Sequence, residues 1–280
     1  MSPLLALGAS LSYGVADFVG AVAARRASAL TVTLGMQAVG LLALLPFLPF
    51  LPGSPSTSAI VIGAVSGAAG TGGLIVYLRF MARGPIGVVS PLAAVTGAAV
   101  PVAWGALVLG DELSILQLAG VALALVSVVV VARVPDSAVH AADIGAVVGG
   151  LSAGVLFGGF FIALDATPAD SGMWPLVGAR VASAVGLALV MRMMARSIRP
   201  GTATPFILGA GVTDMLANVL FLLATRGGLL SISALLSSLY PVIALLLARR
   251  VLRERLDPVQ SSGVVGALIA MGMLAAVVLP

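Results

Sequence analysis

Three ionisable side chains lie within long apolar stretches of this 280-residue sequence, namely Asp17, Arg180 and Asp214. If these stretches cross a membrane, each charge at mid-membrane costs about 2.5–3.5 kcal/mol on insertion scales, and three unpaired charges cost roughly 8–10 kcal/mol. Such groups must face a cavity, form ion pairs or, for an aspartate, carry a proton. The chemistry that they indicate is the binding of a charged ligand and proton transfer, so they are the first candidates for a functional site.

Amide side chains extend these charges into two predicted polar clusters. A helix rises about 1.5 Å per residue, which places Arg180 and Asn218 at similar depth and Asp214 one turn deeper, on the same helix side as Asn218. We therefore expect Arg180, Asp214 and Asn218 to form one cluster, and Asp17 and Gln37 to form a second cluster near the opposite membrane face. The alternatives are a purely structural Arg180–Asp214 ion pair and a hydrogen bond from Asp17 to a neighbouring helix.

Three aromatic residues are weaker candidates for the same site. Tyr13 shares a helix face with Asp17, while Trp104 and Tyr240 lie in apolar stretches and would line a cavity if they face inward. Packing or anchoring at the membrane interface is the simpler interpretation of both. The predicted substrate-binding residues are Arg180, Asp214, Asn218, Asp17, Gln37, Tyr13, Trp104 and Tyr240.

The remaining residue inventory argues against an enzyme. The sequence has no cysteine and a single histidine, His140, which lies in a polar connection. These absences remove thiol nucleophiles, disulfides, cysteine- or histidine-based metal sites and Ser–His hydrolase chemistry. We therefore expect no catalytic residue, no cofactor and no metal.

The composition is that of a membrane protein. Hydrophobic residues make up 60% of the chain and charged residues 9%, whereas a soluble domain is usually about one quarter charged. So few charges cannot keep the surface of a globule of this size in water. The 14 basic residues are all arginines in short clusters, so the basic balance indicates membrane topology and no nucleic-acid partner.

A spanning helix needs about 20 predominantly apolar residues. Ten windows satisfy this requirement: 3–23, 30–51, 58–82, 85–109, 115–132, 142–164, 173–191, 204–225, 229–248 and 259–279. The short connections leave no room for a soluble domain, and the windows are too long for the strands of a barrel. We predict an all-α polytopic membrane protein with ten transmembrane helices.

The two halves of the chain repeat one another at an offset of about 143 residues. An Arg–Gly pair, at Arg83 and at Arg226, precedes the fourth and the ninth window. Each of these windows is followed by the same order of residue types: Asp111, Leu113, Gln117 and Gly120 in the first half, and Glu254, Leu256, Gln260 and Gly263 in the second. Five helices are an odd number, so the second copy must be inverted, as in many secondary transporters. We expect repeats at 1–135 and 140–280.

With its ten spans, its two five-helix repeats and its duplicated motifs, the whole chain resembles the EamA family of the drug/metabolite transporter superfamily. The resemblance implies secondary transport of small metabolites, often the export of amino acids, other metabolites or toxic compounds. It fixes no substrate.

The arginines predict the orientation. Twelve of the 14 lie in connections after odd-numbered spans, one (Arg226) follows an even-numbered span, and Arg180 is intramembrane. The positive-inside rule then places the odd connections in the cytoplasm and both termini outside. The family resemblance implies cytoplasmic termini, and we follow the charges because they act on insertion directly. A compact chain of this kind fits the inner (plasma) membrane of a bacterium.

Together these features predict a secondary transporter that moves a small polar metabolite, an amino acid or other carboxylate, by alternating access. Arg180 would hold the carboxylate, and Asp214 or Asp17 would take a proton when the substrate leaves. The alternative is a broad-specificity drug or lipid-headgroup exporter of the same superfamily, although 5% aromatic content and a buried arginine argue against cationic drugs. Besides the small-molecule substrate and protons, the expected partners are membrane lipids. We expect the protein to be a monomer or a homodimer.

Overall fold

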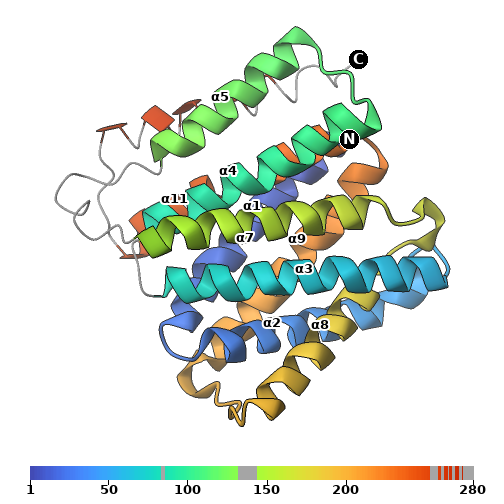
Figure 1. Ribbon diagram of the computed structural model, residues 1–280, viewed down its shortest axis with the longest axis vertical. Coiled ribbons are helices and arrows are strands. Elements are labelled where there is room, and N and C mark those ends of the chain that lie inside the picture. The colour runs from blue at the N-terminus through green and yellow to red at the C-terminus, as the bar shows by residue number, and fades with distance from the viewer. Residues whose placement is uncertain are drawn as a thin grey trace.

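The computed structural model describes residues 1–82, 86–131, 144–252 and isolated positions between 258 and 273. Every regular element within these residues is a helix (Figure 1). The main helices are α1 (Ser2–Ala24), α2 (Ala29–Leu44), α3 (Thr57–Met81), α4 (Ile86–Trp104), α5 (Ile115–Val131), α7 (Ile144–Asp165), α8 (Trp174–Met193), α9 (Thr204–Arg226), α10 (Leu230–Ser237) and α11 (Tyr240–Leu252). Short helical turns are η1 (Leu45–Phe50), η2 (Gly105–Leu109), η3 (Ala169–Ser171) and η4 (Gly201–Ala203).

Seven helices in the described part of the chain are long and apolar enough to cross a membrane. They correspond to the first four predicted spans and to the sixth, seventh and eighth. The fifth and ninth predicted spans contain shorter apolar helices, at Leu118–Ser127 and Leu230–Ala244. The tenth predicted span, 259–279, lies almost wholly outside the described residues, so the number of ten spans stays a prediction.

A two-residue turn at Ser238 and Leu239 separates α10 from α11 within the ninth predicted span. Pro241 has no N–H with which to bond the carbonyl of Ser237, and its ring crowds the preceding turn. The chain instead makes a tight turn in which the Leu239 N–H donates to the Leu236 carbonyl at 3.3 Å. Ser238 and Leu239 therefore lie at a break in the middle of an apolar segment.

Apolar side chains cover the outside of the bundle. Large hydrophobic residues are strongly exposed along several helices, for example Leu4 at 69%, Val65 at 61% and Leu189 at 55%. Backbone groups inside lipid must be bonded within the segment, and a helix meets this requirement by itself. Exposed leucine and valine on helices with bonded backbones are the expected outer surface of a membrane protein.

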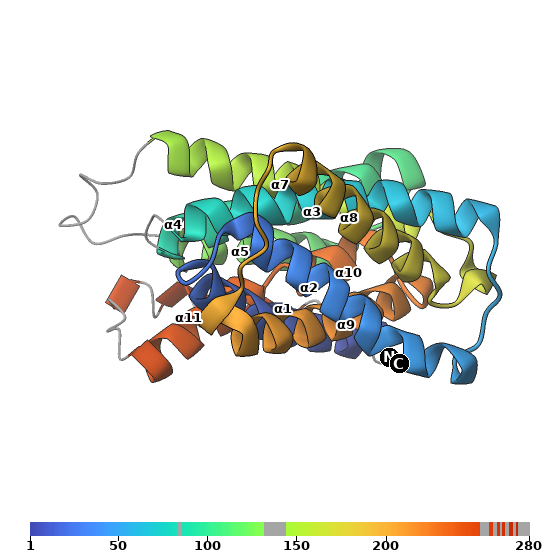
Figure 2. The same cartoon turned by 90° about the horizontal axis from the view of Figure 1, so that it is seen from below.

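Corresponding helices of the two halves run in opposite directions (Figure 1). In that view α1 and α3 run from right to left, whereas α7 and α9 run from left to right. The contacts are paired in the same way: α1 packs against α9 and α7 against α3, while α2 packs against α9 and α8 against α3. In Figure 2 the α3–α7 pair lies above the α1–α9 pair. The bundle thus has an approximate two-fold relation between its halves.

Glycines bring helices of the two halves into backbone contact. A Cβ on Gly67 of α3 would lie 2.6 Å from the Cα of Ala179 in α8, and a Cβ on Gly178 would lie 3.0 Å from the Cα of Ile60. Such contacts allow close approach of helices whose association has no hydrophobic driving force in lipid. Backbone atoms cannot move aside as side chains can, so these positions tolerate only hydrogen.

We expect Gly178→Ala to destabilise the protein by about 1–3 kcal/mol, the usual effect of overpacking. The measurement is thermal unfolding of the protein in detergent. Gly186→Ala is the matched control because it lies on the same helix, where a Cβ would meet nothing within 4 Å. Equal melting temperatures for the two variants would contradict the role of Gly178 in α3–α8 packing.

Candidate functional site

A cavity with about 700 Å³ of empty space lies between the two halves of the bundle. Helices α1 to α4 line it from the first half, and α7, α8, α9 and the α10–α11 break line it from the second. Its polar lining residues are Tyr13, Asp17, Gln37, Thr71, Arg180, Ser183, Asp214, Asn218, Ser238 and Tyr240. Seven of the eight residues predicted from the sequence are therefore brought to one chamber.

Arg180 of α8 is the centre of the polar wall. Its Nη2 lies 2.5 Å from Asp214 Oδ2 of α9, and its Nη1 donates to Gln37 Oε1 of α2. The side chains of Arg180 and Asp214 are 7% and 15% exposed. Within the described residues this is the one ion pair, and it removes most of the cost of placing a charge in the apolar interior.

The network continues on both sides of the ion pair. Gln37 Nε2 donates to Thr71 Oγ1 at 3.0 Å. Asn218 Nδ2 donates to the Asp214 carbonyl at 2.6 Å, and the Tyr13 hydroxyl donates to Asn218 Oδ1 at 2.9 Å. Two of these contacts, Gln37–Arg180 and Tyr13–Asn218, join the first half of the chain to the second.

The network follows the internal repeat. Gln37 and Arg180 are 143 residues apart and touch each other. Their partners, Thr71 and Asp214, are separated by the same offset, and each partner lies 34 residues after its donor. The two copies thus meet at the approximate two-fold axis, where one copy is a neutral Gln–Thr pair and the other a charged Arg–Asp pair.

Asp17 belongs to a different set of contacts. The Tyr77 hydroxyl of α3 donates to Asp17 Oδ2 at 2.8 Å and lies 2.9 Å from Ser90 Oγ of α4. Tyr77 is completely buried. The predicted cluster of Asp17 with Gln37 is therefore wrong, since Gln37 bonds Arg180 and Thr71. The depth estimate treated the helices as parallel, whereas they cross one another at angles (Figure 1).

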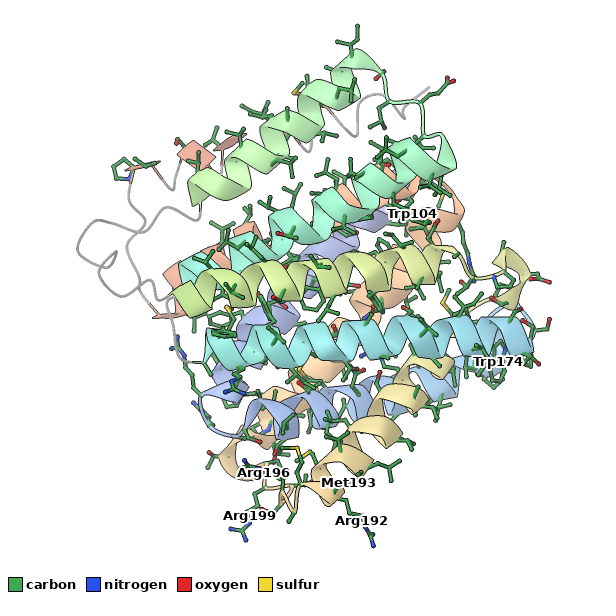
Figure 3. The ribbon with its side chains drawn as sticks, viewed as in Figure 1. Trp104, Trp174, Arg192, Met193, Arg196 and Arg199 are labelled. Atoms are coloured by element: carbon green, nitrogen blue, oxygen red, sulfur yellow. The ribbon has the colours of Figure 1, made fainter. Side chains whose placement is uncertain are left out.

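Trp104 is the predicted residue that does not line the cavity. It ends α4, is 42% exposed and lies at the surface of the bundle (Figure 3). Sequence reasoning also missed Thr71, Tyr77 and Ser90. The repeat offset would have identified Thr71 as the equivalent of Asp214, whereas nothing in the sequence singles out Tyr77 or Ser90.

Aromatic side chains form a second, apolar wall. Phe157, Phe160 and Phe161 of α7 line the cavity together with Tyr13 and Tyr240. The ring centroids of Tyr13 and Phe161 are 6.1 Å apart, and those of Tyr13 and Tyr240 are 6.4 Å apart, both in edge-to-face geometry. A ligand with one polar and one apolar side would match the two walls.

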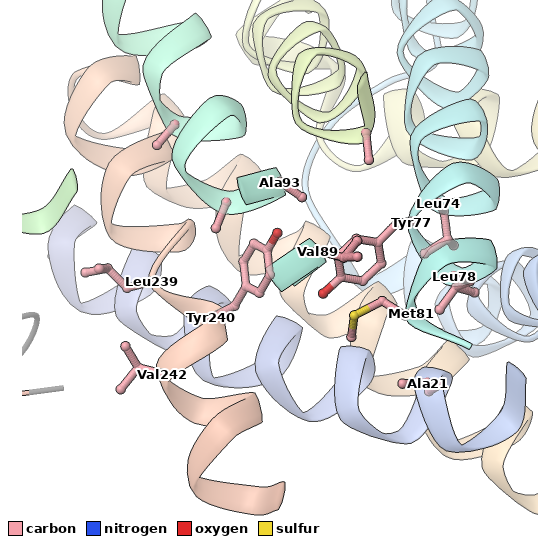
Figure 4. Close-up of a cluster of buried hydrophobic side chains, with 14 of the residues drawn as sticks. Ala21, Leu74, Tyr77, Leu78, Met81, Val89, Ala93, Leu239, Tyr240 and Val242 are labelled. Carbon is pink, nitrogen blue, oxygen red and sulfur yellow. The ribbon is translucent and has the colours of Figure 1, made fainter. Parts of the chain in front are cut away.

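Packed apolar residues lie between the cavity and each end of the bundle. One group contains Ala21, Leu78, Met81 and Val89, where α1 and α3 end and α4 begins (Figure 4). The other group contains Leu164, Met173, Leu176, Leu222 and Leu230, where α7 and α9 end and α8 and α10 begin.

Within the described residues, no group of three or more His, Cys, Asp and Glu residues is arranged to hold a metal ion.

The comparisons with known proteins agree with this architecture. The EamA-like transporter family matches residues 1–133 and again residues 144–276. Among 28 matching chains of solved structures, one described only as a protein crystal structure has a TM-score of 0.71 and 18% identity, and the match covers 99% of this chain and 96% of that one. That likeness shows the fold alone. No curated protein matches the chain.

We expect Arg180→Met and Asp214→Asn each to lose about 3–5 kcal/mol of stability, because each leaves one charge buried without its partner. The double variant should lose less than the sum of the two. Thr71→Val, which removes the equivalent neutral acceptor, should cost about 1 kcal/mol. The measurement is unfolding in detergent, and strictly additive losses would contradict a direct ion pair.

Proposed function

We propose that this chain, which belongs to the EamA-like transporter family of the drug/metabolite transporter superfamily, carries a small metabolite with a carboxylate group across its membrane. The family makes it a multi-pass membrane transporter with a small-molecule substrate. The observation that carries the finer proposal is the guanidinium of Arg180, the one arginine among the described residues that is buried, in the wall of a cavity between the two halves.

Arg180 suits a carboxylate because its planar fork of N–H donors matches two carboxylate oxygens. In this structure Nη2 of the fork donates to Asp214 Oδ2 and Nη1 donates to Gln37 Oε1. A substrate carboxylate would replace Asp214 on the guanidinium, while Gln37 continues to orient Nη1. The apolar part of the substrate would lie against Phe157, Phe160 and Phe161, so an amino acid or another carboxylate with an apolar group fits best.

The transport step would be alternating access. We take the halves 1–135 and 140–280 as inverted repeats of a ten-span bundle that rock against each other. Contacts near a rotation axis move least, so the Gln37–Arg180 bond would persist while the apolar residues at the two ends of the bundle separate in turn. This motion would expose the cavity to one side of the membrane at a time.

Proton coupling is part of the proposal because the cavity contains two carboxyl groups and one arginine. Asp214 is held by Arg180 when no substrate is present, so Asp17 is the carboxyl group left to take up a proton when the substrate leaves. The proton would then return across the membrane in exchange for the substrate.

Transport in proteoliposomes tests both parts of this proposal. We expect an imposed pH gradient to drive the flux of amino acids or other small carboxylates. We also expect Arg180→Lys, which lacks the planar fork, to raise KM by about tenfold. Arg192→Gln, at an exposed surface position, is the control and should transport normally. Flux that persists when the gradient collapses would eliminate proton coupling, and normal flux in Arg180→Gln would eliminate the carboxylate role.

We further propose that the protein lies in the inner membrane of a bacterium with both termini outside. Arg192 in the last turn of α8 and Arg196 and Arg199 in the connection after it project from the bundle (Figure 3), in keeping with a cytoplasmic position. Since the chain has no cysteine, single cysteines report topology directly. An impermeant maleimide should label Ser54→Cys in intact cells and Ser197→Cys only after permeabilisation. The reverse pattern would establish cytoplasmic termini.

A further inference from the structure

We infer that Asp17, together with the hydroxyl groups of Ser238 and Tyr240, forms a subsite for a protonated amine of the substrate. This inference rests on the proposed function, because the subsite is a second polar region of the same cavity. The carboxylate site alone requires only a carboxylate on the substrate, whereas this subsite also requires a positive charge.

The first observation is a pair of buried hydroxyl groups without partners. Tyr240 is 7% exposed and Ser238 is 3% exposed, and both line the cavity. Neither the Tyr240 hydroxyl nor Ser238 Oγ has a hydrogen-bond partner among the described residues. Buried polar groups are almost always bonded, so two such hydroxyls in one cavity wall indicate a ligand that completes them.

The second observation is the state of Asp17. Tyr77 donates to one carboxylate oxygen of Asp17, and the other oxygen has no hydrogen bond to any residue that the structure describes. The Asp17 side chain retains accessible surface in the cavity wall. The charges of Arg180 and Asp214 cancel each other. Once Asp17 has lost its proton, its negative charge therefore has no cation among the described residues that line the cavity.

The third observation is the arrangement of these groups around Asp17. In Figure 4 Tyr240 of α11 and Tyr77 of α3 are drawn on either side of the label of Val89 of α4. The Tyr77 hydroxyl donates to Asp17 Oδ2, and Asp17, Ser238 and Tyr240 all line the cavity. The carboxylate, the two tyrosines and the break at Ser238 therefore surround one region of the cavity.

A protonated amine matches this region better than other groups. An ammonium has three donors, which suit a carboxylate oxygen and two hydroxyl oxygens, and its charge balances that of Asp17. A neutral hydroxyl of a substrate would leave the charge of Asp17 without compensation, and an anion would be repelled.

Matched pairs of acids with and without an amine test the inference on the full chain in detergent. The probes are L-leucine against 4-methylpentanoate and L-phenylalanine against 3-phenylpropanoate, with binding measured by calorimetry at neutral pH. We expect the wild type to prefer the amine-bearing member of each pair by about tenfold or more, as for a charge-assisted hydrogen bond. Asp17→Asn should remove this preference by weakening the binding of the amine-bearing member of each pair.

Tyr240→Phe and Ser238→Ala each remove one hydroxyl of the subsite, and each should reduce the preference. They provide the test if Asp17→Asn does not fold. Ser10→Ala is the matched control, since Ser10 Oγ is also buried without a partner but does not line the cavity. It should bind both members of each pair as the wild type does.

The outcomes separate the two proposals. Equal binding of both members by the wild type, or a preference that survives in Asp17→Asn and in both hydroxyl variants, would overturn the amine subsite and leave the carboxylate role of Arg180 intact. Stabilisation of the protein by Na⁺ alone, relative to choline, that Asp17→Asn abolishes would also overturn it. If neither member of either pair binds, the proposed function fails and the subsite fails with it.

Discussion

The burial of Arg180 is the constraint on which the rest of the site depends. A guanidinium stays charged at any pH that a protein tolerates, so in an apolar bundle it must be surrounded by acceptors. Asp214 and Gln37 supply them from α9 and α2. Since Gln37 belongs to the other half of the chain, satisfying Arg180 also fixes how the two halves meet. Gln37 in turn donates to Thr71 of α3. The need to neutralise one charge thus positions α2, α3, α8 and α9 around a common cavity.

The internal repeat explains why these polar groups lie together at the approximate two-fold axis. The difference between the two copies explains why one pair is charged and the other neutral. The pairs Gln37–Thr71 and Arg180–Asp214 are the same contact in the two repeats. Identical pairs would give a cavity with equal ends. Because one repeat supplies a charged pair and the other a neutral pair, the wall of the cavity is asymmetric. An asymmetric wall can orient a substrate whose two ends differ in charge or polarity. Close backbone packing at glycines, such as Gly67 against Ala179, holds α3 against α8 beside the cavity.

The cavity combines two environments that bind different parts of a ligand. The phenylalanines of α7 supply an apolar surface, and the Arg180 network and Asp17 supply charge. Because Arg180 and Asp214 are only 7% and 15% exposed, the electrostatic interaction between them is stronger than it would be in water. The packed apolar residues at the two ends of the chamber are the parts of the bundle that must separate for a substrate to enter. Where α9 ends, Arg226 also bonds the Pro168 carbonyl and Ser171 Oγ, so these hydrogen bonds would have to break with the packing.

The sequence by itself determined the class of protein, the membrane helices and the family, because hydropathy, the scarcity of charge and the repeated motifs are local or periodic properties. It also identified Asp17, Arg180 and Asp214, since a charge in an apolar segment stands out without a structure. The tertiary structure alone decided which groups meet. Gln37 contacts Arg180 and not Asp17, Trp104 lies at the surface, and Tyr77 reaches Asp17 from a distant helix. These contacts depend on the crossing and rotation of helices in space, and a one-dimensional depth estimate contains neither.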